Sequence, residues 1–235
     1  MTSISIIIPA YNEEKNLSRL LPVLAKQIAK DDEIIIVDSQ STDDTARISA
    51  KNGARIISMA KLGIGPARTL GAKSASNPVV AFLDADTEPP DFWVSRIKTH
   101  FNDPNVEVVG GLDTYKYDNL IENIMYNSYT WIIHLWGLFI YKTIGNCWVP
   151  SNNSAFLKRV FLNAGGYRNL IAEDGDMALR LRPKKAVYDF ILKVRFSDRR
   201  FKEKGFFRTL VLWAISNAEA TLNIRRTDRA VNYRK

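Results

Sequence analysis

The sequence predicts a single Rossmann-like α/β domain with a mainly parallel central sheet and helices on both faces, followed by a basic amphipathic helical segment. Two observations indicate this fold class. Short runs rich in Ile and Val alternate with segments of helical periodicity in the first half of the chain. Those runs are apolar throughout, as in parallel strands buried on both sides. The length of 235 residues suits one domain with a sizeable core.

The first half of the chain supplies the expected strands and helices in alternation. Residues 4–8 form a β-branched run that we expect to end at Pro9, and Asn12 is a candidate N-cap for a helix over 13–29. The elements expected next are a strand over 33–37, a helix over 45–51, a strand over 54–58 and a strand over 79–83.

Two carboxylates, Asp84 and Asp86, follow the strand expected over 79–83. Residues two apart in an extended chain point to the same side, so both side chains can reach one hard cation. Paired acids in a turn are also common as solvated or helix-capping residues. Ligands of open α/β sheets bind beyond the carboxyl ends of the strands. Polar clusters at 9–13, 38–39 and 84–86 follow three such ends, and we expect them to converge on one crevice.

These motifs resemble those of family 2 glycosyltransferases, which have the A-type nucleotide-sugar-binding fold. The matching segments are Ile-Pro-Ala-Tyr-Asn-Glu at 8–13, Val-Asp-Ser-Gln-Ser-Thr-Asp-Asp-Thr at 37–45 and Leu-Asp-Ala-Asp at 83–86. The resemblance is dense over the donor-side motifs and continues more sparsely to residue 182. It implies a donor nucleotide-binding half over residues 1–100 and an acceptor half over 101–192, together forming one catalytic domain.

The resemblance also implies a pocket for the nucleoside of a UDP- or GDP-linked sugar. Pro9, Tyr11 and Glu13 would line the nucleobase and ribose pocket, and Asp38 would accept a hydrogen bond from the base. The alternative for Tyr11 is a surface aromatic side chain without a ligand. The sequence does not distinguish a uracil pocket from a guanine pocket.

A metal and diphosphate site follows from the same resemblance. Asp84 would hold the ribose or a metal, and Asp86 would coordinate Mg²⁺ or Mn²⁺ that bridges the diphosphate. Segment 63–68 would begin a helix beside the nucleotide, where small residues permit close backbone approach and Arg68 can meet phosphate or Asp84. Its two glycines match neither the dinucleotide-binding pattern nor a Walker-type phosphate loop.

A second acidic pair, Glu173 and Asp174, is the candidate catalytic pair. Members of the resembled family place Glu-Asp at the start of a helix that faces the acceptor, and Asp174 would remove the proton from the attacking hydroxyl. The alternative is capping, because acids in the first turn of a helix over 174–181 gain from its dipole. The Gln-x-x-Arg-Trp motif of polymer-forming relatives is missing, so we expect a single transfer.

The excess positive charge lies at the C-terminal end. Residues 193–235 contain 12 Lys or Arg and 4 Asp or Glu, whereas the remainder contains 21 of each kind, so the net charge of +8 belongs to this segment. Apolar residues recur there at helical spacing over 205–224. Such a helix can lie on an anionic membrane surface or pack on the catalytic core.

The aromatic-rich segment 129–141 has only 13 residues, fewer than the about 20 needed to cross a bilayer. It suits a buried core helix, a dimer face or an interfacial helix. An interfacial helix would bring the site near a lipid-linked acceptor, such as a polyprenyl phosphate or glycolipid, although a glycan acceptor and a homodimer stay open. Cys147, His100 and His134 form no recognisable zinc or nucleophile set, and a single Cys excludes an intrachain disulfide.

The leading interpretation is therefore a metal-dependent glycosyltransferase that acts near a membrane, with inversion of the sugar implied by the resemblance. The sequence begins with a strand rather than a signal segment, so we expect a cytoplasmic protein, peripheral at the inner membrane face. A sugar-nucleotide pyrophosphorylase is the first alternative, but residues 9–15 supply no Gly-rich triphosphate loop. The others are an inactive nucleotide-sugar binder and a basic membrane- or nucleic-acid-binding module. No nucleic-acid-binding motif supports the last.

Overall fold

The computed structural model describes residues 2–60, 63–115 and 119–196, together with residues 205, 208, 209, 211 and 215. Its strands are β1 Ile4–Ala10, β2 Glu33–Asp38, β3 Arg55–Ser58, β4 Val79–Leu83, β5 Thr87–Glu88, β6 Val106–Thr114, β7 Asn153–Leu157 and β8 Lys185–Phe196. Its helices are α1 Glu14–Ala25, α2 Thr45–Lys51, α3 Ile64–Ser74, α4 Trp93–His100, α5 Leu120–Ile144, α6 Lys158–Asn163 and α7 Glu173–Arg180. The helix expected over 205–224 lies largely outside the described residues.

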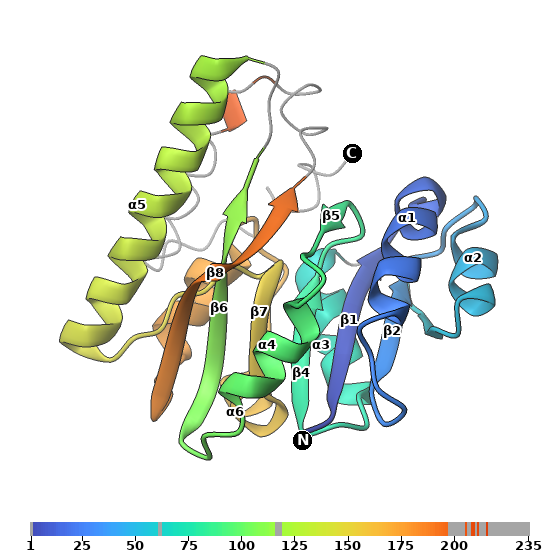
Figure 1. Ribbon diagram of the computed structural model, residues 1–235, viewed down its shortest axis with the longest axis horizontal. Helices are drawn as coiled ribbons and strands as arrows, with labels where there is room; N and C mark the ends of the chain where they lie inside the picture. Colours follow the sequence, from blue (N-terminus) through green and yellow to red (C-terminus); the bar gives the residue numbers. More distant parts are fainter. Residues whose placement is uncertain are drawn as a thin grey trace.

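The described strands form one sheet in the order β3-β2-β1-β4-β7-β6-β8-β5 (Figure 1). The four strands of the first half are parallel, with Ala10 beside Asp38 and Ile7 beside Phe82. Strand β7 then runs antiparallel to both β4 and β6, while β6 and β8 are parallel and β5 is antiparallel to β8. Four of the seven described pairs are parallel, so the mainly parallel sheet is confirmed. The parallel pairing of β1, β2 and β4 brings their carboxyl ends to one edge.

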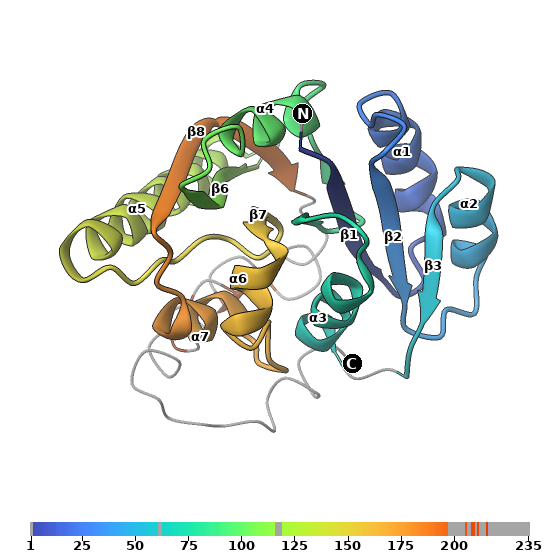
Figure 2. The same ribbon diagram turned by 90° about the horizontal axis from the view of Figure 1, so that it is seen from below.

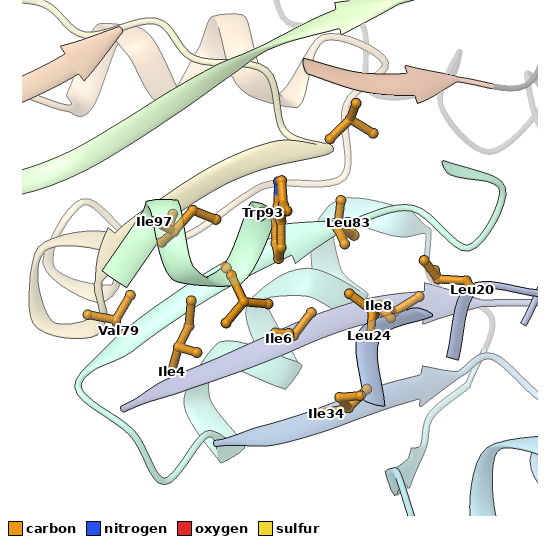
Figure 3. Close-up of a cluster of buried hydrophobic side chains, with 14 of the residues drawn as sticks. Ile4, Ile6, Ile8, Leu20, Leu24, Ile34, Val79, Leu83, Trp93 and Ile97 are labelled. Atoms are coloured by element: carbon orange, nitrogen blue, oxygen red, sulfur yellow. The ribbon is translucent and has the colours of Figure 1, made fainter. Parts of the chain in front are cut away.

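Helices cover both faces of this sheet, as predicted. Helices α1 and α4 lie on one face, and α3, α6 and α7 lie on the other (Figure 2). Figure 3 shows Ile4, Ile6 and Ile8 of β1 pointing toward Leu24 and Trp93 on the α1 and α4 side. The alternate residue Ile7 packs instead with the α3 side. A strand apolar on both sides is thus buried on both sides.

Strand β1 extends past Pro9, where the sequence predicted its end. Proline lacks the N–H that a central strand needs. Here the carbonyl of Ala10 accepts a hydrogen bond from Ser39 on the β2 side (2.9 Å). The backbone of Pro9 therefore faces the other neighbour, and the ladder with β4 has already ended at Ile7. No ladder bond is lost at Pro9.

The N-cap prediction for Asn12 is wrong. Asn12 has a positive φ of 53°, and its side-chain oxygen accepts from the backbone N–H of Thr42 (2.8 Å), joining the loop after β1 to the loop after β2. Helix α1 also ends at Ala25 rather than at residue 29. The reason is a turn in which the Asp32 carboxylate accepts from the N–H of Ala29 (2.7 Å).

Segment 129–141 belongs to α5, a helix of 25 residues that Asn119 caps through its side chain. Its buried side is small or polar and comprises Tyr126, Thr130, His134 and Gly137. Gly137 allows close packing on Trp148 and Tyr188, because a Cβ there would lie 3.0 Å from the indole of Trp148. Among the described residues, no helix combines the length and the apolarity that a membrane span requires.

Gly65 is required where α3 meets the loop before α7. A Cβ at this position would lie 2.0 Å from the backbone oxygen of Arg168. The sequence led us to expect that small residues at 63–68 admit a nucleotide backbone, whereas here the glycine admits this chain's own loop. That contact holds the first turn of α3, and with it Arg68, against the second half of the sheet.

Substituting Gly65 tests this contact. Gly65→Ala should lower the free energy of unfolding by about 1–3 kcal/mol, since a backbone atom must move to admit the methyl group. Urea unfolding followed by circular dichroism measures the change. Lys73→Ala on the exposed side of the same helix is the control and should be close to neutral. An unchanged midpoint for Gly65→Ala would show that the contact is not tight.

Candidate active site

A cavity opens beside Arg68, between the start of α3, the end of β6, the inner side of α5 and the start of α7. We call it the Arg68 cavity. Its charged and polar wall comprises Arg68, Asp84, Asp113, Ser151, Asn152, Glu173 and Asp174. Its aromatic wall comprises Tyr115, Tyr126, Tyr129, Trp148 and Phe196. Acidic and aromatic side chains together suit a ligand that has many hydroxyl groups on an apolar ring.

Arg68 is the centre of this cavity's electrostatics. Its side chain is 1% exposed and bonds Asp84 through one terminal nitrogen and Glu173 through the other, both at 2.5 Å. The guanidinium also lies 5.8 Å from the ring centroid of Tyr167. A buried cation requires such partners, because desolvation alone would expel it. The two carboxylates come from residues 84 and 173, so the bridge ties the end of β4 to the start of α7.

Asp174, the predicted base, lines the Arg68 cavity beside this bridge. It is half-buried, and its Oδ1 accepts from the N–H of Gly175 (2.9 Å). Burial, together with the neighbouring charge of Glu173, raises the pKa of Asp174 to about 7. A carboxylate with this pKa both releases and accepts a proton near neutral pH, which is the property a general base needs.

Asp113 is a functional candidate that the sequence reasoning missed. It lies near the end of β6, lines the Arg68 cavity and accepts a hydrogen bond from Asn152 (3.2 Å). Burial raises the pKa of Asp113 to about 8, with further contributions from the charges of Asp84 and Asp174. Its protonated form can donate a hydrogen bond at neutral pH. The signal was an acid following an apolar strand, the pattern that had already identified Asp38 and Asp84.

His134 is packed between α5 and β6, and its ring also lines the Arg68 cavity. It is 3% exposed, with Nδ1 at 2.7 Å from the carbonyl of Thr130 and Nε2 at 2.6 Å from the carbonyl of Gly111. Burial lowers the pKa of His134, and the two carbonyls oppose this shift. The Nε2 contact joins α5 to β6, whereas the Nδ1 contact stays within α5.

The loops after β1 and β2 are joined to each other and lie apart from the Arg68 cavity. The N–H of Glu13 donates to Thr45 Oγ1 (2.8 Å), and Asp38 Oδ1 accepts from the N–H of Ser41 (3.1 Å). The side chain of Tyr11 is exposed on these loops. None of the four residues predicted for the nucleobase pocket is among the described residues that line the cavity. These four residues and the Arg68 cavity lie along the same carboxyl edge of the sheet.

Asp84 and Asp86 point to different cavities, contrary to the alternation expected from an extended chain. Strand β4 ends at Leu83, and residues 84–87 make a turn in which the Thr87 side chain donates to the carbonyl of Asp84 (2.7 Å). Asp84 lines the Arg68 cavity, whereas Asp86 lines a second one, called here the Asp86 cavity. The two cavities adjoin, since Phe196 lines both.

The Asp86 cavity offers oxygen ligands to a hard cation. Asp86, Glu88 and Asp91 line it on the sheet side, and Asn16 and Arg19 line it from α1. Among the described residues, no cluster of three His, Cys, Asp or Glu side chains is arranged as a complete metal site. Mg²⁺ in nucleotide enzymes is usually held by one or two carboxylates together with substrate phosphates. The residues present fit that kind of shared site.

The open sheet, the polar loops at its carboxyl edge and the acidic cavity define a protein of the A-type nucleotide-sugar-binding fold. Residues 5–162 match the family model of Glycosyl transferase family 2. The chain belongs to this family.

Similar proteins agree with this assignment. Glycosyltransferase AglE of Haloferax volcanii is 31% identical over 124 residues, an alignment that covers 49% of this chain and 41% of that relative. Glucosyl-3-phosphoglycerate synthase from Mycobacterium tuberculosis, in complex with Mn²⁺ and UDP-glucose, has a TM-score of 0.62 at 19% identity and covers 92% of this chain and 79% of its own. Mannosyltransferase PcManGT from Pyrobaculum calidifontis, in complex with GDP-Man and Mn²⁺, has a TM-score of 0.63 at 16% identity and covers 98% and 74%. At such identities these structures show the shared fold.

Removing the guanidinium at the centre of the site should be costly. Arg68→Met should lower the free energy of unfolding by about 3–5 kcal/mol at pH 7, because Asp84 and Glu173 lose their buried counter-charge. The deficit should shrink as the pH falls, since unpaired carboxylates then bind protons. Urea unfolding at pH 7 and pH 5 measures both effects.

Arg47→Met is the matched control. Arg47 pairs with Asp44 at 2.6 Å on the surface, where their side chains are 70% and 52% exposed. Its loss should leave the free energy of unfolding close to that of the wild type, because water screens an exposed ion pair. Equal effects of the two substitutions would contradict a structural role for the Arg68 bridge.

Proposed function

We propose that this protein moves one sugar from a nucleoside diphosphate sugar to an acceptor hydroxyl, with inversion at the anomeric carbon. One observation carries the proposal. Asp174 lines the same cavity as Asp84, and Arg68 is bonded between Asp84 and Glu173. This arrangement sets a candidate base across from the sheet edge where nucleotides bind in open α/β folds. Family membership favours this activity over the pyrophosphorylase alternative.

The donor is proposed to lie along the carboxyl edge of β1, β2 and β4. Pro9, Tyr11, Glu13 and Asp38 would hold the nucleoside on the joined loops. The complexes of the two similar structures with UDP-glucose and GDP-Man support a donor of this class, and their Mn²⁺ supports a divalent cation. Asp86 would hold Mg²⁺ or Mn²⁺, which when bound offsets the negative charge of the leaving diphosphate, whereas Asp84 stays paired with Arg68.

The proposed reaction is a direct displacement. The acceptor oxygen forms a bond to the anomeric carbon while the bond from that carbon to the β-phosphate oxygen breaks, and the electron pair leaves with the nucleoside diphosphate. Asp174 takes the proton of the acceptor hydroxyl. Glu173 stays paired with Arg68, and its negative charge contributes to the raised pKa of Asp174. Protonated Asp113 would donate a hydrogen bond to a sugar hydroxyl across the cavity.

The acceptor is proposed to be membrane-linked. A base with a pKa of about 7 serves an acceptor that must lose a proton, as a sugar hydroxyl does. A polyprenyl phosphate oxygen would not need this help at neutral pH. Of the acceptors considered from the sequence, a glycolipid or a glycan therefore agrees better with Asp174 than a polyprenyl phosphate does. A single transfer is expected, as the sequence indicated.

Asp174→Asn should abolish transfer and keep donor binding. The amide cannot accept the proton, so kcat should fall by about 10²–10⁴-fold, the usual contribution of a general base. Release of nucleoside diphosphate with an acceptor present measures transfer, and calorimetry measures donor binding. Because burial disfavours the Asp174 carboxylate, its removal should not lower Tm. Retained turnover in Asp174→Asn would exclude Asp174 as the general base and show that another group accepts the proton.

Asp176→Asn is the control on the same helix. Asp176 pairs with Arg168 and Arg180 and is not among the described lining residues of the Arg68 cavity. It should keep transfer within a few-fold of the wild type. In the wild type, kcat/KM should rise with pH through about 7, since Asp174 must be deprotonated to act. A flat profile from pH 5.5 to pH 8.5 would count against the base.

Asp86→Ala should remove the metal dependence of nucleotide binding. Calorimetric titration of UDP and GDP, each with and without Mn²⁺, measures this and identifies the nucleoside. We expect metal to strengthen binding to the wild type by at least about tenfold and to leave the variant unaffected. Asp103→Ala is the control and should retain the metal effect, because Asp103 pairs with Lys185 and is not among the described lining residues of either cavity. Equal metal dependence in Asp86→Ala and wild type would exclude Asp86 as the ligand.

A further inference from the structure

Helix α5 has its apolar side outward. Large side chains recur along that side at spacings of three and four residues, and we call them the outer face: Ile121, Ile124, Ile132, Leu135, Trp136 and Phe139. Ile132 is 63% exposed and Trp136 is 59% exposed. The inward side is polar or small. A surface helix of a protein in water has the reverse arrangement, so the outer face requires an apolar partner.

Helix α5 carries few charged side chains, and a lysine of β8 lies beside it. Between residues 120 and 144 the sequence has one acid, Glu122, and one base, Lys142. At the edge of the outer face, Trp131 stacks on Phe190 of β8 with ring centroids 5.1 Å apart. Lys193 Nζ lies 5.9 Å from the Trp131 ring centroid. Aromatic side chains with a flanking lysine are typical of the headgroup level of a membrane.

We infer that the outer face of α5 docks on a lipid bilayer that carries anionic headgroups. At 1.5 Å per residue, α5 is about 37 Å long, so it offers a long apolar stripe that would lie flat in the interface. The net charge of +8 in segment 193–235, which begins within β8 at Lys193, supplies attraction to anionic lipid. The docking itself does not depend on the proposed function. Only its consequence, that the cavity reaches a lipid-linked acceptor, rests on the proposed function.

Docking of the outer face would determine where the Arg68 cavity lies relative to the bilayer. The inward side of α5 contributes Tyr126, Tyr129 and Thr130 to the Arg68 cavity, one helix diameter from the outer face. Docking therefore brings the cavity to the height of lipid headgroups. An acceptor sugar on a lipid could enter it while its hydrocarbon chain stays in the bilayer.

Two other occupants are less consistent with these features. A second copy would set two outer faces together, and the lysine at their edge would then repeat across the interface without an acidic partner on α5 beyond Glu122. The chain's own tail would need its apolar side buried. Its described residues Val211 and Ile215 are instead exposed. A bilayer accommodates both the apolar stripe and the flanking cation.

Flotation of the full-length protein with vesicles tests the docking. Vesicles of phosphatidylglycerol mixed with phosphatidylcholine should bind it, and vesicles of phosphatidylcholine alone should bind it more weakly. The double substitution Ile132→Gln with Trp136→Gln should weaken binding by at least about tenfold, because two apolar side chains no longer enter the interface. Phe92→Gln, which changes a similarly exposed aromatic residue before α4, should have no effect. Brominated phosphatidylcholine in the mixed vesicles should quench tryptophan fluorescence, and less so in Trp136→Phe.

Each contrary outcome overturns the inference. One is no vesicle binding by the wild type; another is a dimer in sedimentation that the double substitution dissociates while vesicles stay unbound. A third is binding that Arg225→Gln with Arg226→Gln abolishes and the outer-face substitution leaves intact. Failure of docking is separable from failure of the proposed function. Vesicle binding needs no donor, and transfer to a water-soluble acceptor needs no vesicle.

Discussion

The buried guanidinium of Arg68 is the constraint on which the site depends. A cation that is 1% exposed is stable in a protein only with close counter-charges, and here they come from Asp84 and Glu173 at 2.5 Å each. Those partners lie 89 residues apart in the chain. The bridge can form only if α3 packs tightly against the loop before α7, which is why Gly65 has no room for a Cβ. Fold, close packing and electrostatics thus meet at one side chain.

The balance of charge around Arg68 accounts for the chemistry available to the cavity. One guanidinium faces four carboxyl groups: Asp84, Asp113, Glu173 and Asp174. Two of these, Asp84 and Glu173, are paired with it, so the remaining two are buried without a full counter-charge. Burial without a full counter-charge raises the pKa of Asp174 to about 7 and that of Asp113 to about 8. Excess acid in a partly closed cavity therefore yields one group suited to accept a proton and one suited to donate a hydrogen bond.

The sequence was most informative where local pattern determines structure. The apolar strands of the first half follow from their periodicity and from the turn residues that bound them. Through the family resemblance, the sequence also placed a helix start near residue 64 and the acids at the start of α7. It was less informative where tertiary contacts decide. The side-chain alternation expected at Asp84 and Asp86 does not occur, because β4 ends at Leu83, before both acids, and a hydrogen-bonded turn follows. Asp113 was missed because β6 lies in the half of the sheet where parallel and antiparallel pairs are mixed, and no local pattern revealed that pairing. The sequence alone could not show that the apolar side of α5 faces outward, because this depends on which side of the helix packs on the sheet.

The most direct test of the account is a crystal structure of the protein with GDP or UDP and Mn²⁺, with the metal located by anomalous scattering. The account predicts a metal peak at roughly 2.0–2.6 Å from a carboxylate oxygen of Asp86. It also predicts the nucleobase on the joined loops that contain Tyr11 and Asp38, and the β-phosphate facing the cavity that Asp174 lines. Nucleotide bound away from that sheet edge, or a metal held without Asp86, would contradict the proposed transfer site.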